Sequence, residues 1–525
     1  MIIPSTIRQL KSKLRYSFQP FFGRFGKLTP VQLQAIPLVL EGRNAVVTSA
    51  TASGKTESVV APLAEICVSD RLQGIAVVYI VPTRALANDT FDRIHGPLQD
   101  MGLNASIKHG DKPHVSLTTA PHFLITTPES FDSFLCRRPG HLLSVRAIIV
   151  DEVHMIDRTQ RGDQMRVLLR RLQHLIGDRQ INLYLLSATL AEPKAVASRY
   201  ISHFEIVSVP GKRNLNYQAL AGYDDLYETA KNHKLRKLLV FCNYRASVEK
   251  VAGELSSRWH PYPVVVHHGS LSRHVRQEAE SVMQETQVAV CVATSTLEVG
   301  IDIGDIDAIV LAETPWSISS LLQRIGRGNR RSNEIRVLSV IKSEAEKQVL
   351  ATMIGLAKVG AISSQTYKAH QTVTVQQTLS IVFQHKNGIA ISELAELLSP
   401  IANSYQTQAV VAYLKLNGLL EQLGQHILPA TKLMDWADRG EIHSNIPDSN
   451  SCKVVDSETG KEIGQVSGSV NELFALGQRS WKIESLTGGT LKVKRHKGKA
   501  TAADFVKHFG KGAFTNLVPP ELKDM

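Results

Sequence analysis

The chain has 525 residues, a hydrophobic content of 43%, a charged content of 21% and a formal net charge of +12. This length exceeds what one hydrophobic core supports, so three or four domains are expected in a soluble globular protein. No apolar run approaches the length of a membrane span, and the N-terminal stretch MIIPSTIRQLKSKLR lacks the apolar core of a signal peptide. The excess of positive charge predicts a polyanionic partner, most simply nucleic acid.

The cysteines are few and dispersed along the chain. None forms a C-x-x-C pair, so a zinc or iron–sulfur site built on clustered cysteines is not expected. Dispersed cysteines are typical of a reducing compartment, and a cytoplasmic location is predicted. The five cysteines are Cys67, Cys136, Cys242, Cys291 and Cys452.

The first part of the chain alternates apolar, strand-like runs with amphipathic stretches, and each run ends in a polar or Pro/Thr-rich turn. This pattern is typical of an α/β domain with a parallel sheet, in which ligands bind at the carboxyl ends of the strands. Strands are predicted at 45–47, 75–81, 123–126, 147–150 and 183–186.

A second set of apolar runs predicts a second α/β domain. The two domains are expected to meet near residues 207–216, a segment that contains Pro210 and Gly211 and has no helical periodicity. The strands of the second set are predicted at 237–242, 264–267, 288–293, 308–311 and 336–341.

The pattern changes after Ser343. Short helices that end in a strand favour a winged-helix module. From about Glu441, short strands alternate with Gly and Asn turns, which predicts a small β-barrel or sandwich. The helices are predicted at 344–359, 375–384, 391–398 and 406–416, and the strand at 426–428.

Residues 49–56 read S-A-T-A-S-G-K-T and follow the first predicted strand. The end of this stretch matches a P-loop, in which backbone N–H groups and a helix N-terminus hold phosphate oxygens. Lys55 supplies a positive charge, and Thr56 supplies a hydroxyl for Mg²⁺. Ser49 and Ala52 depart from the pattern; both are small, although Ala52 does not take a positive φ as cheaply as glycine. The helix after the loop is predicted over 57–66, with an interruption at Pro62. The alternative to a P-loop is an ordinary strand–helix turn.

Two adjacent acids, Asp151 and Glu152, follow the strand at 147–150. In a P-loop protein, the first acid would hold Mg²⁺ through water, and the second would orient and deprotonate the attacking water. The alternative is a solvated acidic turn.

An arginine-rich, glycine-broken segment, Q-R-I-G-R-G-N-R-R, occupies residues 323–331. Arg327 and Arg330 could act as arginine fingers that stabilise charge on a γ-phosphoryl group. The alternatives are a patch that binds the phosphate backbone and a basic helix N-terminus on the surface.

The ordered set of motifs resembles a superfamily 2 helicase of the DEAD/DEAH type. Nine matches in order, at the ends of predicted strands, are far more specific than any one of them. They are F-G-x-x-T-P-V-Q at 25–32 (Q motif), 49–56 (motif I), P-T-R-A-L at 82–86 (Ia), T-T-P-E at 126–129 (Ib), D-E-V-H at 151–154 (II), S-A-T at 187–189 (III), F-C-N at 241–243 with Arg245 (IV), A-T-S-T-L-E-V-G-I-D-I at 293–303 (V) and 323–330 (VI).

Within this superfamily the chain is most similar to the helicase core of the large helicase-related (Lhr) family. The D-E-V-H spelling, the stretch A-T-S-T-L-E-V-G-I-D-I-G-D-I-D and the stretch L-L-Q-R-I-G-R-G-N-R carry the resemblance, which extends through V-T-V-Q-Q-T-L-S-I-V-F and A-L-G-Q-R-S-W-K-I-E-S-L-T-G-G-T-L-K-V. Motif VI departs from the usual pattern at Gly328 and Asn329, although no charged group is lost. The resemblance implies two tandem RecA-like domains at 1–206 and 207–365, a winged-helix-like domain at 366–430 and a small β-barrel-like domain at 431–525.

The resemblance implies ATP and Mg²⁺ as cofactors. Phe22 and Phe25 both remain candidates for stacking on adenine. Thr56 and Asp151 are the expected metal ligands, and Lys55, Asp151, Glu152, Arg327 and Arg330 the expected catalytic residues. The nucleotide-binding residues are expected to be Gln32, Ser49, Ala50, Thr51, Ala52, Ser53, Gly54, Lys55, Thr56, Gly300, Asp302, Arg327 and Arg330, and the coupling residues His154, Ser187, Thr189 and Gln323.

Single-stranded or tailed duplex nucleic acid is the implied partner, held mainly through its phosphates. Trp436 is a possible stacking platform, whereas Trp481 is expected in the β-barrel core. The run Lys492, Lys494, Arg495, Lys497 and Lys499 is either a phosphate track or a solvated guard on an edge strand. The expected contact residues are Pro82, Thr83, Arg84, Thr127, Pro128, Asn243, Arg245, Thr294 and Ser295, for which turn and capping chemistry is the alternative at the threonines.

Three functions remain open from the sequence. The first is an ATP-dependent helicase or translocase that moves 3′→5′ on DNA or an RNA–DNA hybrid, in DNA repair or genome maintenance. The second is a helicase that acts mainly on RNA. The third is a nucleic-acid-binding scaffold with a weak ATPase.

Overall fold

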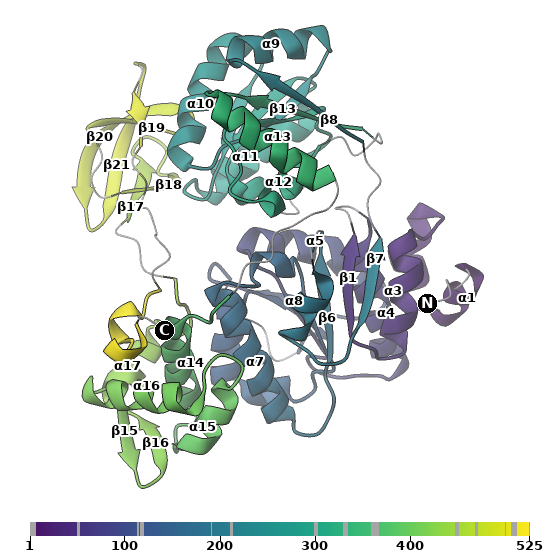
Figure 1. The fold of residues 1–525 in the computed structure, drawn as a ribbon, viewed down its shortest axis with the longest axis vertical. Coiled ribbons are helices and arrows are strands. Elements are labelled where there is room, and N and C mark those ends of the chain that lie inside the picture. The colour runs from purple at the N-terminus through teal and green to yellow at the C-terminus, as the bar shows by residue number, and fades with distance from the viewer. Residues whose placement is uncertain are drawn as a thin grey trace. The chain divides into compact units, whose positions relative to one another are not determined.

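The computed structural model describes residues 7–523 except 50–52, 113–114, 116–119, 189, 191, 210–213, 299–302, 329–333, 359–366, 447–450, 468–470, 499, 504 and 506–511. The chain forms two compact units, drawn in Figure 1. Unit 1 comprises residues 1–210, 364–448 and 510–525, and unit 2 comprises residues 211–363 and 449–509. Each unit pairs one α/β domain with one smaller module.

The α/β domain of unit 1 is built on a seven-stranded sheet in the order β3-β4-β2-β5-β6-β1-β7, and every described strand pair is parallel. The five predicted strands are confirmed. The outermost strands β3 and β7 were not predicted, because they are only partly buried and lack a continuous apolar run. The strands are β1 (Ala45–Ser49), β2 (Val77–Ile80), β3 (Ala105–Lys108), β4 (Phe123–Thr126), β5 (Ala147–Val150), β6 (Asn182–Ser187) and β7 (Glu205–Val209).

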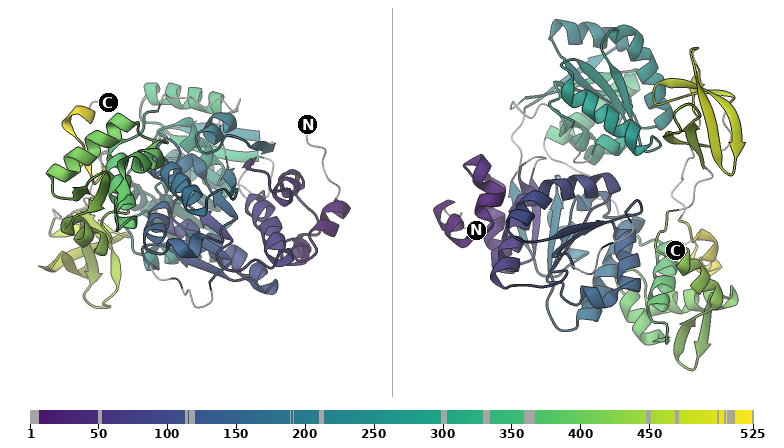
Figure 2. Two further views of the ribbon diagram at one scale, coloured as in Figure 1. Left: turned by 90° about the horizontal axis from the view of Figure 1, so that it is seen from below. Right: turned by 180° about the vertical axis from the view of Figure 1, so that it is seen from behind.

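Helices cover both faces of this sheet, as Figure 2 shows. The interruption predicted at Pro62 is wrong, because α4 runs without a break from Lys55 to Ser69. Proline removes one backbone N–H bond, but nearly every side chain around it is buried, and this packing outweighs the local cost. The helices are α1 (Ile7–Lys13), α2 (Phe18–Phe22), α3 (Pro30–Leu40), α4 (Lys55–Ser69), α5 (Arg84–Asp100), α6 (Pro128–Arg137), α7 (Gln160–Ile176) and α8 (Pro193–Ser198).

The α/β domain of unit 2 has a six-stranded parallel sheet in the order β10-β11-β9-β12-β13-β8. The predicted strands are again confirmed, and the first strand, β8, was missed. The strands are β8 (Asn214–Leu220), β9 (Lys237–Phe241), β10 (Val264–His267), β11 (Ala289–Ala293), β12 (Ala308–Leu311) and β13 (Glu334–Val340), and the helices are α9 (Tyr223–Asn232), α10 (Arg245–Trp259), α11 (Arg273–Glu285), α12 (Ile318–Ile325) and α13 (Glu344–Lys358).

The winged helix is part of unit 1. It contains the three predicted helices and a small antiparallel sheet in the order β14-β16-β15. The core also includes Phe514, Val518 and Leu522 from the end of the chain. Its elements are α14 (Gln371–Gln384), β14 (Ile389–Ala390), α15 (Ile391–Leu398), α16 (Ser404–Leu416), β15 (Leu420–Leu423), β16 (His426–Pro429) and α17 (Thr431–Asp438). Helix α17 was not predicted from the sequence; it is short and packs on α14.

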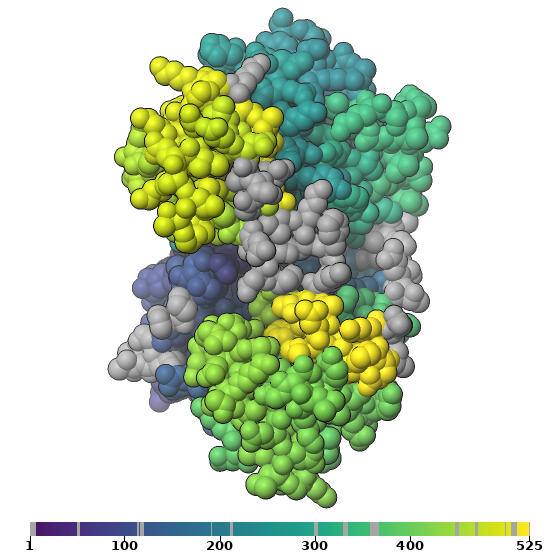
Figure 3. Space-filling model, turned by 90° about the vertical axis from the view of Figure 1, so that its left-hand side faces the viewer, coloured from purple at the N-terminus to yellow at the C-terminus, as the bar shows by residue number. Residues whose placement is uncertain are grey.

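The β-domain is part of unit 2 and forms a six-stranded sheet in the order β18-β17-β21-β20-β19-β22. Figure 3 shows it packed directly against the second α/β domain. Its strands are β17 (Ser451–Asp456), β18 (Glu462–Ser467), β19 (Leu473–Leu476), β20 (Arg479–Thr487), β21 (Thr490–His496) and β22 (Thr501–Ala502). The residue ranges proposed from the sequence for the four domains stay predictions.

Candidate nucleotide and nucleic-acid sites

The loop between β1 and α4 depends on a glycine in a left-handed conformation. Gly54 has φ +86°, and a Cβ at this position would lie 2.2 Å from Gln32 Nε2. Gln32 is buried, donates from Nε2 to the Gly54 carbonyl at 3.3 Å, and forms a capping box with Thr29 at the start of α3. The Q motif therefore closes directly on the P-loop. Ala50, Thr51 and Ala52 lie outside the described residues.

Lys55 and Thr56 form the first turn of α4, and both are buried. Lys55 Nζ donates to the Ser49 carbonyl at 2.5 Å, so the lysine spans the loop. Arg93 Nη1 from α5 donates to Thr56 Oγ1 at 3.3 Å. The buried Ser53 Oγ has no hydrogen-bond partner among the described residues. An unpaired donor, a lysine and a helix N-terminus together favour a bound anion.

The acidic pair at the end of β5 is buried rather than solvated. Tyr79 Oη donates to Asp151 Oδ2 at 2.6 Å, and the backbone N–H of Glu152 donates to Asp151 Oδ1 at 2.8 Å. Burial and the neighbouring Glu152 raise the pKa of Asp151 to about 6, against the lowering effects of Tyr79 and Lys55. A carboxyl group in this position gains from a nearby cation. The alternative of a solvated acidic turn is therefore wrong.

Motif II connects to motif III through His154. Its Nδ1 lies 2.7 Å from Ser187 Oγ and 3.4 Å from Glu152 Oε2. The backbone N–H of Ala188 donates to the same Glu152 oxygen at 3.4 Å. Glu152 itself has φ +46°, a left-handed conformation that is uncommon outside glycine and is found at functional sites. Thr189 lies outside the described residues.

Two members of this cluster, Tyr79 and Arg93, were not predicted from the sequence. Tyr79 reads as one more apolar residue of β2, and Arg93 as a solvated residue of α5. Their polar atoms meet the P-loop and the acidic pair only because β2 and β5 are neighbours in the sheet and α5 packs against α4. Neither neighbour relation is visible in the local sequence.

The two phenylalanines that were candidates for adenine stacking differ in exposure. Phe22 is buried and packs against Phe18 and Phe21. Phe25 is 55% exposed, and the Arg24 guanidinium lies 4.6 Å from its ring centroid. An exposed ring is available to a ligand, so Phe25 is the better candidate.

Motifs Ia and Ib are joined by Arg161 of α7, which the sequence analysis did not select. Arg161 donates to the Pro82 carbonyl and makes a two-point ion pair with Glu129, with distances of 2.5 Å and 2.8 Å. Thr83 caps α5 by accepting from the Leu86 N–H at 3.2 Å, as the capping alternative predicted.

The other expected contact residues of unit 1 differ in exposure. Arg84 is exposed and paired with Asp111, whereas Thr127 and Pro128 are buried at the start of α6. The Thr127 side chain makes no capping hydrogen bond. Of these residues, Arg84 is the one whose side chain faces solvent.

In unit 2, motif IV is held by the loop after β12. Asn243 donates from its backbone N–H to Glu313 Oε2 at 2.6 Å and from Nδ2 to the Thr314 carbonyl at 2.8 Å. Arg245 Nη1 donates to Ser270 Oγ at 2.8 Å, and burial lowers the pKa of its guanidinium. The Asn243 side chain thus positions the loop.

Motif V begins at the next strand end. Thr294 is buried and directly follows β11, and the next residue, Ser295, is exposed. Ser295 and the half-buried Arg245 are therefore the more accessible of the expected contact residues in unit 2.

The arginines of motif VI in the described part are buried, so the alternative of a surface helix N-terminus is wrong for them. Arg324 donates to Glu298 Oε1 at 2.7 Å and to Asn243 Oδ1 at 2.9 Å. Arg327 donates from Nη2 to the Glu298 carbonyl at 2.9 Å. Gln323 is half-buried on α12. Gly300, Asp302 and Arg330 lie outside the described residues.

Trp481 lies in the core of the β-domain, as predicted, and its Nε1 donates to the Leu476 carbonyl at 2.9 Å. Trp436 packs partly buried against the winged-helix core, with Lys432 Nζ 5.6 Å from its ring centroid.

The edge-strand interpretation of the basic run is wrong at Lys492, where β21 pairs with β17 on one side and β20 on the other; at Lys494 and Arg495 the described pairing is with β20 alone. The phosphate-track alternative stays a prediction: the basic residues of the run that are described, which are Lys492, Lys494, Arg495 and Lys497, are exposed. Lys499 lies outside the described residues.

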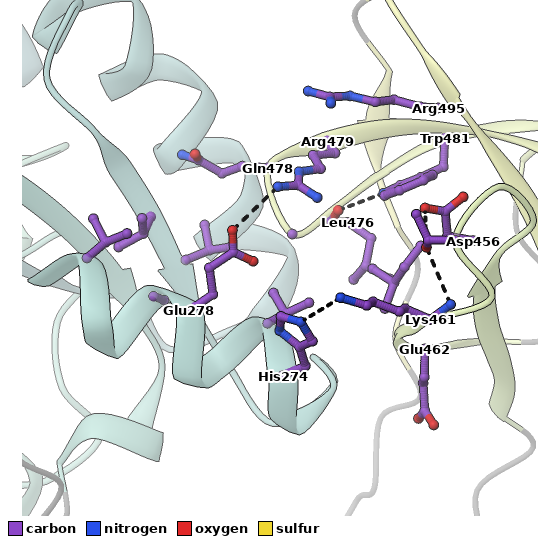
Figure 4. Close-up of a pocket in the computed structure, with 18 residues that line it drawn as sticks. His274, Glu278, Asp456, Lys461, Glu462, Leu476, Gln478, Arg479, Trp481 and Arg495 are labelled. Atoms are coloured by element: carbon purple, nitrogen blue, oxygen red, sulfur yellow. Dashed lines mark hydrogen bonds and ion pairs between the residues drawn. The ribbon is translucent and has the colours of Figure 1, made fainter.

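A cavity of about 460 Å³ lies between α11 and the β-domain (Figure 4). Lys461 Nζ lies 3.2 Å from His274 Nε2, and Arg479 Nη2 lies 3.7 Å from Glu278 Oε1. A lysine–imidazole hydrogen bond and an arginine–glutamate ion pair thus already cross this cavity, which is therefore a polar seam of the contact between the α/β domain and the β-domain.

Two family models match the chain: the DEAD/DEAH box helicase model over residues 29–196 and the helicase conserved C-terminal domain model over residues 221–332. The chain is 30% identical over 428 residues to the ATP-dependent helicase Lhr-Core protein 2 of Thermococcus barophilus, covering 72% of this chain and 48% of that protein. It is 28% identical over 555 residues to the ATP-dependent helicase Lhr-Core of Methanothermobacter thermautotrophicus, covering 91% and 63%. The chain thus spans about half to two thirds of the length of these relatives.

Solved structures agree with these matches. The Mycobacterium smegmatis helicase Lhr, bound to ssDNA and AMP-PNP, is similar with a TM-score of 0.70 and 25% identity, covering 83% of this chain and 62% of that one. The DUF1998 helicase MrfA bound to DNA has the same fold, with a TM-score of 0.74, 19% identity and coverage of 93% and 69%. No helix in the described part of this chain has the length and hydropathy needed to cross a bilayer. The chain belongs to the DEAD/DEAH box helicases of superfamily 2 and is a relative of the Lhr helicases.

Proposed function

We propose that this chain is an ATP-dependent helicase or translocase that loads on single-stranded DNA, with 3′→5′ polarity as the family resemblance implies. The observation that carries the proposal is the buried cluster of Lys55, Thr56, Asp151 and Glu152, which joins a phosphate-binding loop to an acidic pair. We further propose a cytoplasmic protein of DNA repair or genome maintenance.

The described residues fit ATP and Mg²⁺. Gly54 leaves room where a Cβ would clash, Ser53 has a buried hydroxyl without a partner among the described residues, and the raised pKa of Asp151 leaves a carboxyl group that gains from a cation. Thr56 and Asp151 would hold Mg²⁺, which when bound neutralises charge on the phosphates. Lys55 and the N-terminus of α4 would bind the phosphates, and Phe25 and Gln32 would contact the base.

Glu152 is proposed as the general base. Its left-handed backbone turns the carboxylate toward His154 and the Ala188 N–H, and these two contacts orient it. Because His154 also contacts Ser187, movement in motif III would reach the Glu152 carboxylate through these two contacts of His154. From unit 2, we propose that Arg327 and Arg330 stabilise charge on the transferred phosphoryl group and that Asp302 and Gln323 contribute to coupling.

Two variants test the assignment of these roles. Glu152→Gln should abolish ATP turnover and keep nucleotide binding, because the amide cannot accept a proton. Lys55→Ala should also weaken nucleotide binding. Glu205→Gln is the matched control. It removes a carboxylate at the start of β7, the strand beside β1, at the end of the sheet away from the P-loop. Equal nucleotide affinity in the wild type and Lys55→Ala would refute the phosphate-binding role.

The choice between DNA and RNA needs a separate assay. DNA is favoured because the Lhr structure at 25% identity carries ssDNA, while a helicase that acts mainly on RNA is the competing proposal. Unwinding of DNA, RNA and hybrid duplexes, each with a 3′ or a 5′ tail, separates the two. We expect activity on 3′-tailed DNA or hybrid and ATP hydrolysis that rises when single strands are added. Full ATP hydrolysis without nucleic acid would contradict the coupling.

A further inference from the structure

An exposed aromatic pair in unit 2 has no part in the function described so far. Tyr244 is 50% exposed and Trp316 is 70% exposed. Their ring centroids lie 5.7 Å apart at an interplanar angle of 84°. Exposure of large apolar rings to water is unfavourable, and covering them with a ligand would be favourable. Two such rings side by side therefore suggest a binding surface.

The two rings project from the ligand-binding edge of the sheet. Phe241 at the end of β9 lies opposite Ala293 in β11 and Leu311 in β12. The loops that follow these strands therefore start at the same edge. Tyr244 follows β9 and Trp316 follows β12, beside the loop after β11 that carries Ser295.

The loops that carry the rings are fixed before any ligand arrives. Asn243 joins them through its bonds to Glu313 and the Thr314 carbonyl, at 2.6 Å and 2.8 Å. Ser247 Oγ donates to Glu313 Oε1 at 2.7 Å, and Arg324 holds the Asn243 amide oxygen. A rigid aromatic pair loses little conformational entropy on binding.

We propose that Tyr244 and Trp316 form a stacking platform for one base of a single nucleic-acid strand. This proposal rests on the proposed function, because it assigns a contact to the strand on which the motor would act. Rings stack on any base without reading its sequence, and the nearby Arg245 and Ser295 provide the polar groups that phosphates need.

A protein partner fits the pair less well. Each ring buries about 150–250 Å² when covered, and two rings fall short of the roughly 800 Å² per partner of a stable protein interface. A base needs no larger surface than the pair offers.

Strand binding by Trp316 variants tests the platform. We expect Trp316→Ala to weaken binding of single-stranded DNA about tenfold and Trp316→Phe to retain most of the affinity, because a ring face remains. Tyr262→Ala is the matched control: Tyr262 is 51% exposed but lies just before β10, at the amino end of the same sheet. This control should bind as the wild type does.

An abasic strand separates stacking from loss of structure. The affinity of Trp316→Ala and of the wild type should differ less on a strand of abasic sites than on oligo-dT. Intrinsic fluorescence should fall when oligo-dT binds the wild type and change less in Trp316→Phe, since Trp259 and Trp481 are buried and Trp436 packs partly buried against the winged-helix core.

The outcomes distinguish the two proposals. A wild type that binds no single strand overturns both the platform and the proposed function. A wild type that binds strands with the same affinity as Trp316→Ala overturns the platform alone. An equal loss on oligo-dT and abasic strands also overturns it.

Discussion

The winged helix joins the first α/β domain through a buried polar network, whereas the β-domain joins the second α/β domain through a shared apolar core. In the first contact, the fully buried Asp132 of α6 accepts from Arg171 of α7 at 2.7 Å and from Ser380 and Gln376 of α14 at 2.6 Å and 2.8 Å. Arg171 also donates to Gln377 at 2.9 Å. The Arg171 guanidinium holds the pKa of Asp132 well below its usual range against the opposing effect of burial.

In the second contact, one cluster of buried residues contains side chains of both domains, among them Val264 and Val266 of β10 and Phe474 and Trp481 of the β-domain. Directional bonds also cross it: Gln465 N–H donates to the Ser270 carbonyl and Ser272 N–H to the Ile463 carbonyl, each at 2.7 Å. The buried Glu249 accepts from the backbone N–H groups of Gly477 and Gln478 at 2.7 Å and 3.0 Å. All of these bonds lie around the apolar core and involve one buried carboxylate at most.

The difference predicts how each contact fails. A polar network is stable in one arrangement, because any displacement leaves a buried charge without its partner. Apolar packing is not directional, and the free energy lost when it is disrupted grows with the apolar area that becomes exposed. The first contact should therefore be more sensitive to single polar substitutions, and the second to changes in shape.

Asp132, Cys136 and His443 lie together in the first contact and are the residue types of a metal site. Arg171 donates to Asp132 and, from Nη2, lies 3.1 Å from Cys136 Sγ. A fixed positive charge between two of the three potential ligands disfavours a metal cation. The cluster is better described as the ionic centre of the contact.

Arg171→Ala should produce the largest effect. This substitution leaves the Asp132 carboxylate buried without its cation. The stabilisation free energy of the first contact should therefore fall by about 3–5 kcal/mol. Hydrogen exchange of the α14 amides measures this loss. The double variant Asp132→Leu/Arg171→Met should recover most of it, because no unpaired charge remains. Normal α14 protection in Arg171→Ala would show that the ion pair does not hold the winged helix.

Gly464→Ala should break the second contact instead. A Cβ at Gly464 would lie 2.2 Å from the Ser270 carbonyl oxygen, where β18 meets the loop after β10. Because both backbones must shift, we expect the second contact to lose about 2 kcal/mol of stability. Faster hydrogen exchange in β18, with unchanged exchange in α14, would measure this loss. Gly253→Ala is the control: a Cβ there meets open space within α10, so a gain of about 0.5–1 kcal/mol is expected. Equal stability of both variants would contradict the close contact.

These two contacts also show what the sequence could predict. Apolar periodicity located ten of the thirteen strands of the two parallel sheets and three helices of the winged helix, because burial of a strand or helix face leaves a local pattern. The partly buried strands β3, β7 and β8 left no such pattern. The P-loop and the acidic pair were found for the same reason, since their residue types stand at the ends of such strands. Asp132, Arg171 and Gln376 left no pattern, because they are polar residues on helices that read as solvated until α6, α7 and α14 pack together.

The same limit explains the errors at the candidate site. Tyr79 and Arg93 were missed because their partners come from distant segments. The helix-breaking effect of Pro62 was overestimated, because a local rule was applied to a helix that is stabilised by burial. The basic run was open to an edge-strand interpretation because strand order cannot be read from one strand.

Alkaline pH should weaken the first contact and leave the apolar packing of the second unchanged. Burial alone would lower the pKa of His443, but Asp132 and Cys136 raise it to about 9. Since this folded-state pKa lies above the unfolded value of about 6.5, the stabilisation is fully present below pH 6.5 and is lost as pH rises through about 9. We expect a loss on the order of 1–2 kcal/mol in α14 protection from exchange. His443→Gln should remove this dependence, and an equal dependence in that variant would assign it to another group.

The smallest effects should come from the exposed ion pairs at the rims of the two contacts. Arg170 of α7 lies 2.7 Å from Glu396 of α15, with side chains 43% and 57% exposed, and Arg479 lies 3.7 Å from Glu278, with side chains 48% and 52% exposed. Because water and salt screen such pairs, Arg170→Ala and Arg479→Ala should each change stability by less than about 1 kcal/mol, and less at high salt. Arg170 is also the neighbour of Arg171 on the same helix and reaches the same module, so the two alanine variants differ mainly in burial. If Arg170→Ala were as damaging as Arg171→Ala, the charge of α7 as a whole would hold the winged helix, and the contrast between a buried network and an apolar core would fail.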